Sequence, residues 1–101
     1  MVCFGLMTTR FTWDPEKAAS NLRKHGASFE GALTVFGDPL ARIHDDPHHS
    51  ERERREIIVG HSTRGRLLLV SFTERSGVIR LISARGATRH ERKDYEEATR
   101  S

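Results

Sequence analysis

Cysteine is almost absent from these 101 residues. Because Cys3 is the only one, the chain can form neither an internal disulfide nor a four-cysteine zinc site. No apolar run approaches the length of a membrane span, and residues 2–7 lack the basic region of a secretory signal. We therefore expect a cytoplasmic protein with a disordered leader at residues 1–10 and a single domain at residues 11–101.

Two catalytic signatures are missing as well. No serine stands in a nucleophile-elbow sequence, and no glycine-rich loop could cradle a phosphate. Basic residues are plentiful instead, with 17 Lys and Arg against 14 Asp and Glu and a net charge of +3. Arginine dominates this set, and its planar fork suits phosphate. The composition favours a nucleic-acid partner, and a soluble protein with mixed surface charge is the alternative.

The N-terminal third predicts two short helices joined by a glycine. Asp14 can cap the first helix because its carboxylate accepts hydrogen bonds from free amides of the first turn. Gly26 can adopt the left-handed conformation that ends this helix. Ser28 caps a second helix, whose apolar stripe extends to Phe36.

His25 falls in the apolar stripe of the first helix. At about 100° per residue it follows Ala18 and Leu22, whereas Lys24 points to the opposite side. His25 would then dock in the core or line a cleft. A histidine that only interacts with the helix dipole is the structural alternative.

The remaining sequence completes an α+β pattern, with an antiparallel sheet of three to four strands and one C-terminal helix. Short Gly-containing turns separate three β-rich runs. The polar segment 45–53 is expected to be a solvated loop, and Thr88 caps a last helix that runs to about Arg100. The expected strands are 40–44, 56–62, 66–73 and 78–84.

Arg80 lies between aliphatic residues in the last of these strands. Strict alternation places it on one face of the sheet and Arg85 on the other. A charged side chain in this position needs an open face or a carboxylate partner. Glu56 and Glu91 are the candidate partners.

A cationic surface built from these residues could bind and cleave RNA. Cleavage by the adjacent 2′-hydroxyl needs a base, an acid and cations for the charged phosphorane, and it requires no metal. Strand lengths place Arg64 near Arg85 and put Arg75 at the opposite end of the sheet. The candidate residues are Lys24, His25, His61, Arg64, Arg75, Arg80 and Arg85.

A metal site is the competing interpretation of the histidine-rich segment. Imidazole and carboxylate are suitable ligands for zinc. However, the segment is irregular and lacks the helical spacing of histidines that preorganises a metal site, so a solvated loop is favoured. The potential ligands are His44, Asp45, Asp46, His48 and His49.

An ordered series of short motifs resembles the BrnT toxins of type II toxin–antitoxin systems. The similarity extends from about residue 11 to residue 97, and its specificity comes from the order of the motifs. They are Phe11-x-Trp13-Asp14, Asn21-x-x-Lys24-His25-Gly26, Ser28-Phe29-Glu30, Val35-Phe36-x-Asp38-Pro39, Glu53-x-Arg55, Ile58-x-Gly60, Phe72-Thr73-x-Arg75, Arg80-x-Ile82-Ser83-Ala84-Arg85 and Glu91-Arg92-x-x-Tyr95-Glu96.

This resemblance implies a RelE-like fold and an endoribonuclease that inhibits translation without a metal or other cofactor. It also implies a BrnA-like ribbon-helix-helix antitoxin as partner and no membrane partner. The implied complex is dimeric in the antitoxin, with a homodimer within a heterotetramer as one assembly, and contacts operator DNA only through the antitoxin. A non-catalytic interaction module that represses its operon together with the antitoxin is the alternative function.

The resemblance also suggests roles for individual residues. Lys24 or His25 would act on a proton, and Arg75, Arg80 and Arg85 would hold phosphate. Glu91 would orient an arginine rather than act as a base, with Tyr95 as a further supporting residue. His61 and Arg64 rest on spacing alone. A structural ion-pair network of Arg80, Arg85 and Glu91 is the alternative.

Overall fold

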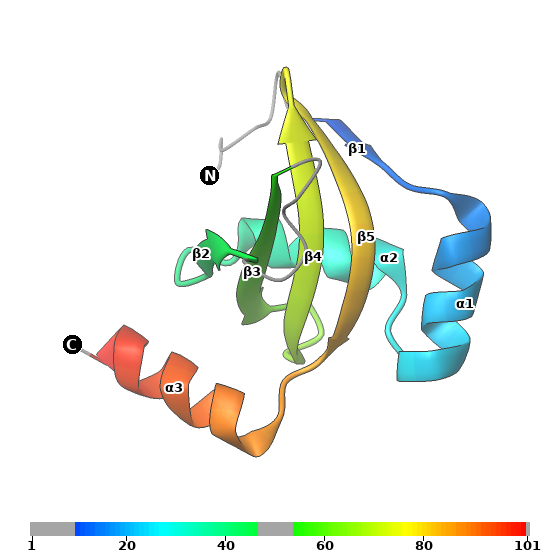
Figure 1. The fold of residues 1–101 in the computed structure, drawn as a ribbon. Helices are drawn as coiled ribbons and strands as arrows, with labels where there is room; N and C mark the ends of the chain where they lie inside the picture. Colours follow the sequence, from blue (N-terminus) through cyan, green and yellow to red (C-terminus); the bar gives the residue numbers. More distant parts are fainter. Residues whose placement is uncertain (1–9, 47–53, 101) are drawn as a thin grey trace.

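The computed structural model describes residues 10–46 and 54–100, so the predicted leader up to residue 9 and segment 47–53 lie outside the described residues. In the described part, a five-stranded mixed sheet has the order β1-β5-β4-β3-β2 (Figure 1). The strands are β1 (Arg10–Thr12), β2 (Arg42–Asp45), β3 (Arg55–His61), β4 (Leu67–Arg75) and β5 (Val78–Gly86). The helices are α1 (Pro15–His25), α2 (Phe29–Leu33), the 3₁₀ helix η1 (Thr34–Gly37) and α3 (Arg89–Arg100).

The α+β class and the helix after the sheet are confirmed. The two predicted N-terminal helices are α1 and α2, but β1, a strand of the sheet, precedes them. The prediction of an antiparallel sheet of three to four strands is wrong, because β1 adds a parallel edge strand. Arg10, assigned to the leader, pairs with Val78 in this strand. Three residues are too few to show a periodic pattern, and their partner lies far along the chain.

The predicted helix caps are present. The Asp14 carboxylate accepts a hydrogen bond from Glu16 N at 2.9 Å, and Gly26 has φ 67°. Ser28 Oγ accepts from Gly31 N at 3.0 Å. The second helix is shorter than predicted, because α2 ends at Leu33 and the chain continues as η1.

Helix α1 turns a different face to the protein from the one predicted. Leu22 is 50% exposed and His25 is also exposed, so of the expected stripe only Ala18 packs against the core. Asn21 is buried instead: its Nδ2 donates to Ala84 O at 2.8 Å and to Ala27 O at 2.9 Å, and its Oδ1 accepts from Ala84 N at 3.1 Å. One amide side chain therefore pairs with β5 as a neighbouring strand would, at an edge that β1 is too short to reach.

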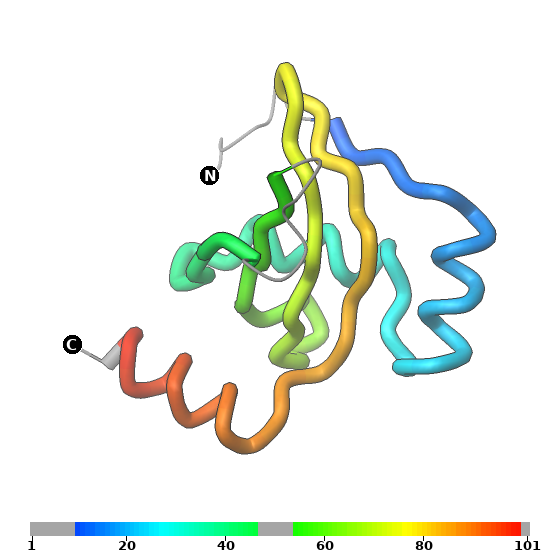
Figure 2. The backbone as a smooth tube through the Cα atoms, viewed as in Figure 1, coloured from blue at the N-terminus to red at the C-terminus, as the bar shows by residue number. Residues whose placement is uncertain are grey.

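The core lies on one side of the sheet, which we call the inner face. Helices α2 and η1 cover this face, as Figure 2 shows behind the strands. Phe29, Val35, Val70 and Leu81 are almost completely buried there. Among the described residues, the opposite side, the outer face, is covered at one end, where α3 packs Tyr95 against Val59 and Leu67.

A β-bulge in β5 changes which residues share a face. Phe72 pairs with Leu81 but Ser71 pairs with Ser83, so Ile82 has no opposite residue. Arg80, opposite Thr73, and Arg85, opposite Leu69, consequently both lie on the outer face. The prediction that they lie on opposite faces is wrong, because it assumed unbroken alternation.

The hairpin between β4 and β5 is tighter than predicted. Ser76 and Gly77 have φ values of 54° and 81°, as a two-residue type I′ turn requires. Glu74 and Arg75, assigned to the turn, therefore belong to β4. None of the helices in the described part of the chain is long and apolar enough to cross a membrane.

Candidate functional site

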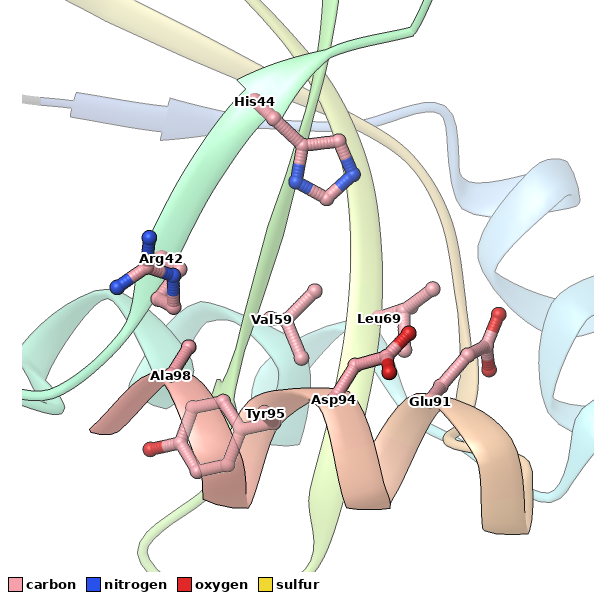
Figure 3. Close-up of a pocket in the computed structure, with 8 residues that line it drawn as sticks. All are labelled: Arg42, His44, Val59, Leu69, Glu91, Asp94, Tyr95 and Ala98. Carbon is pink, nitrogen blue, oxygen red and sulfur yellow. The ribbon is translucent and has the colours of Figure 1, made fainter. Parts of the chain in front are cut away.

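Two adjoining cavities hollow the outer face of the sheet, and we call them together the outer groove. The first, of about 320 Å³, lies between β2 and α3 above Val59 and Leu69 (Figure 3). The second, of about 450 Å³, shares Leu69 and extends along β4 and β5. The basic residues that line the groove are Arg42, His44, Arg55 and Arg85, and the acidic residues are Asp46, Glu91 and Asp94.

Arg42 and His44 reach the groove because they occupy alternate positions of β2. In Figure 3 their side chains project from this strand, and Glu91 and Asp94 project from α3 on the other side of the groove floor. Arg42 and His44 are exposed. The groove thus combines arginine side chains with an imidazole, a group that can donate or accept a proton.

Arg85 and Glu91 form a bidentate ion pair at the centre of the groove. Arg85 Nη1 donates to Glu91 Oε1 at 2.8 Å, and Nη2 donates to Oε2 at 2.7 Å. This pairing lowers the pKa of Glu91 to about 2 and raises the pKa of Arg85. The predicted pairing of Glu91 with an arginine is confirmed, and Arg80 is not part of it.

The start of α3 fixes Glu91 in place for this role. Glu91 N donates to Thr88 Oγ1 at 3.1 Å, and Thr88 N donates to Glu91 Oε1 at 2.9 Å, which is a capping box. Arg85 Nη1 also donates to Gly86 O at 3.2 Å. Of the five guanidinium donors, Nε–H and one Nη2 hydrogen remain for a ligand. The strand and the helix therefore orient the same cation.

Asp38, which directly follows η1, binds α3, β3 and the segment before β2. Its Oδ2 accepts from Tyr95 Oη at 3.0 Å and from His61 N at 2.7 Å, and its Oδ1 accepts from Leu40 N at 2.9 Å. Partial burial alone would raise the pKa of Asp38, but the bonds from His61, Leu40 and Tyr95 outweigh it and hold that pKa below its usual value.

Tyr95 and His61 complete this polar cluster. Burial and the hydrogen bond to Asp38 raise the pKa of Tyr95 to about 12. The His61 ring lies edge-on to the Tyr95 ring with centroids 5.4 Å apart, and His61 Nδ1 is 3.7 Å from Asp38 Oδ2. Tyr95 lines the outer groove with its ring but uses its hydroxyl to anchor α3.

The structure separates the other predicted residues. Arg80 is exposed on the outer face and, among the described residues, makes no ion pair, so the open-face explanation for it holds. Glu56 faces the other side of the sheet, opposite Phe72. Arg75 is exposed at the far end of β4. Arg85 lies on β5 toward the end of the sheet that holds the β3–β4 turn, but Arg64 in that turn lines a different cavity.

Lys24, His25 and Arg64 lie away from the outer groove. Lys24 and His25 are exposed at the end of α1. Arg64 and Arg66 line a separate cavity of about 420 Å³ beside Gly26. Arg66 donates to Gly26 O at 2.7 Å and so caps α1.

The alternative metal site falls partly on segment 47–53, because His48 and His49 lie outside the described residues. Within residues 10–46 and 54–100, no group of three His, Cys, Asp or Glu side chains is arranged to hold a metal ion.

Sequence reasoning gave no role to Arg42 or Asp38 and considered His44 only as a metal ligand. The alternation of Arg42 and His44 in a short strand was the available signal for a shared face. Asp38 appears in the sequence analysis only as part of a motif. Its contacts with His61 and Tyr95 depend on the tertiary fold.

Comparisons with known proteins agree with this architecture. Residues 13–91 match the family model described as the ribonuclease toxin BrnT of type II toxin–antitoxin systems. Among solved structures, the Brucella abortus ribonuclease toxin BrnT is similar, with a TM-score of 0.60 and 24% identity over 81% of this chain and 100% of that one. This level of identity supports the fold. The search of curated proteins gave no match.

Proposed function

Because this chain belongs to the BrnT family of ribonuclease toxins of type II toxin–antitoxin systems, we propose that it is an endoribonuclease acting in the outer groove. The observation on which this rests is the orientation of Arg85, a cation held by Glu91 in a groove that Arg42 and His44 also line. Fixed cations can stabilise the charge that develops on a phosphate during cleavage.

The proposed reaction is attack by the RNA 2′-hydroxyl on the adjacent phosphorus. A base removes the 2′-hydroxyl proton, the bond to the 5′-oxygen breaks, and an acid protonates that oxygen. The products are a 2′,3′-cyclic phosphate and a 5′-hydroxyl. We assign proton transfer to His44 and phosphate binding to Arg85 and Arg42, with Arg80 binding RNA further along the outer face. Roles for Lys24, His25, His61, Arg64 and Arg75 stay predictions.

The same proposal covers the biological setting. Cleavage would halt translation and would need no metal, and a BrnA-like ribbon-helix-helix antitoxin would neutralise it. The antitoxin would supply the dimer contacts and the contacts with operator DNA. Family membership supports an antitoxin partner in general terms.

Cleavage of a defined RNA by purified, antitoxin-free protein in EDTA tests the proposal. We expect fragments with cyclic phosphate and 5′-hydroxyl ends. The matched variants are His44→Ala in the groove and His90→Ala, which removes an exposed histidine from α3. Cleavage should fall about 10²–10⁴-fold for the first and stay unchanged for the second. Intact RNA with folded natural protein, or equal effects of both variants, would refute the proposal.

A further inference from the structure

Strand β2 leaves one edge of the sheet open. It is the last strand in the sheet order, so among the described residues its outer edge has no pairing strand. Figure 1 shows β2 on the side of the sheet away from α1. All four residues of β2 are exposed, and Ile43 is 54% exposed. Leu40, just before the strand, is 56% exposed.

The register identifies the backbone groups that face outward. Asp46 N donates to Arg55 O at 3.0 Å, and His44 pairs with Ile57 two residues earlier. In an antiparallel ladder, hydrogen-bonded pairs alternate with non-bonded pairs. Arg42 and His44 therefore bond toward β3, and Ile43 and Asp45 direct their N–H and C=O groups away from the sheet.

The side chains along this edge differ between the two faces. Ile43 lies opposite Ile58, a core residue of the inner face, so its side chain extends the inner apolar surface. Arg42 and His44 lie on the outer face and line the outer groove. Asp45 contributes a negative charge, but Arg54 Nη2 lies 3.3 Å from its Oδ1. An added strand would thus meet the aliphatic side chain of Ile43 on one face and the basic side chains of Arg42 and His44 on the other.

We propose that the outer edge of β2 is the docking edge for an extended segment of the antitoxin, which pairs with the sheet as a sixth strand. This rests on the proposed function in that the partner is taken to be an antitoxin. The segment alternates apolar residues, which cover Ile43 and Leu40, with acidic residues, which face Arg42 and His44. Its carboxylates occupy the phosphate-binding side of the groove and so inhibit RNA binding by competition.

Hydrogen exchange of the natural protein, alone and with its purified BrnA-like antitoxin, is the first test. We expect the amides of Ile43 and Asp45 to exchange fast in the free protein and slowly in the complex. Fast exchange of both amides in a saturated complex would overturn the proposal. So would protection that rises with the concentration of this chain alone, because it would assign the edge to a second copy.

Variants at the edge provide the second test. Ile43→Pro removes an outward N–H and the aliphatic side chain, and proline is compatible with an edge strand when its missing N–H faces solvent. Binding of the antitoxin, measured by titration calorimetry, should weaken by at least about tenfold. Ile43→Lys should weaken it too and keeps the strand if proline does not. Leu22→Lys, at a similarly exposed aliphatic residue of α1, is the matched control and should bind normally.

RNA cleavage by the free variants separates this proposal from the proposed function. Ile43→Lys should cleave RNA as the natural protein does while binding antitoxin weakly. If the natural protein binds antitoxin along β2 but cleaves no RNA, the proposed function fails and the docking edge stands. Natural affinity in Ile43→Lys and Ile43→Pro would overturn the docking edge alone.

Discussion

The hydrogen bonds of two single residues, Glu91 and Tyr95, shift their pKa values enough to be detected by experiments at different pH. Glu91 is bound by Arg85 on one side and by Thr88 on the other, and Tyr95 is bound by Asp38. The sequence indicated the contacts of Glu91, because Thr88 and Glu91 have capping-box spacing and Arg85 stands shortly before them. It did not indicate the hydrogen bond between Tyr95 and Asp38, since these residues meet only in the folded chain.

Glu91→Gln should destabilise the fold in a pH-dependent way. The folded-state pKa of Glu91 is about 2 against an ordinary 4.5, so its stabilisation is full above about pH 4.5 and is lost as pH falls toward 2. At pH 7 the variant should lose about 1–2 kcal/mol of unfolding free energy. This figure is discounted because the Arg85 side chain is 42% exposed.

Urea unfolding at pH 7 and pH 2.5 measures this difference. Glutamine can still serve in the capping box, so the effect isolates the charge. Glu97→Gln, at an exposed acid of α3, is the control and should change stability little at either pH. An equal loss for Glu91→Gln at both pH values would contradict the assignment.

Tyr95 should ionise at unusually high pH. It is the only tyrosine of the chain, so ultraviolet absorbance reports its ionisation without interference from another phenol. We expect a midpoint of about 12 in the folded protein and about 10 in urea, because burial and Asp38 disfavour the phenolate. Fold stability should consequently fall as pH rises from about 10 through 12. A folded-state midpoint near 10 would show that the hydroxyl is not held by Asp38.

At the scale of elements, features that depend on neighbouring residues could be predicted from the sequence, and features that depend on distant residues could not. The helix caps at Asp14, Gly26 and Ser28 depend on neighbouring residues, so the amino-acid types in the sequence were enough to predict them. The bulge at Ile82 and the pairing of β1 depend on partners elsewhere in the sheet. The bulge places Arg85 on the same face of the sheet as Arg80, and for that reason the candidate site was only partly predictable.

Asn21→Leu should weaken the docking of α1 on β5. The substitution keeps a similar volume but leaves Ala84 N and two carbonyl groups without their partner. We expect a loss of about 2–4 kcal/mol, measured by urea unfolding. Leu22→Asn, at the exposed neighbouring position, is the control and should cost less than about 1 kcal/mol. Comparable losses for both would mean that Asn21 does not anchor the helix.

Gly60 allows β3 to approach η1 closely. A Cβ atom at this position would lie 2.9 Å from Ala41 Cβ, 3.0 Å from Asp38 Oδ2 and 3.1 Å from Val35 Cγ1. Gly60→Ala should therefore cost about 1–3 kcal/mol and disturb the Asp38 cluster. Gly37→Ala meets nothing within 4 Å and is the matched control. Equal melting temperatures for the two variants would contradict this packing.

At the scale of the whole molecule, the two sides of the sheet have different roles. The inner face is filled by α2, η1 and their aromatic residues, and it supplies most of the core. The outer face has a smaller apolar cluster under α3 and otherwise presents cations to the groove. The open edge at β2 continues this surface, so substrate and inhibitor would meet the protein at one place.

Growth arrest on induced expression is the most direct test that the outer groove is the toxic site. The proteins are the natural chain, Arg85→Ala in the groove and His25→Ala at the end of α1, each with its soluble level measured. We predict arrest by the natural protein and by His25→Ala, and normal growth with soluble Arg85→Ala. Arrest by Arg85→Ala at an equal soluble level would contradict the assignment of the site to the outer groove.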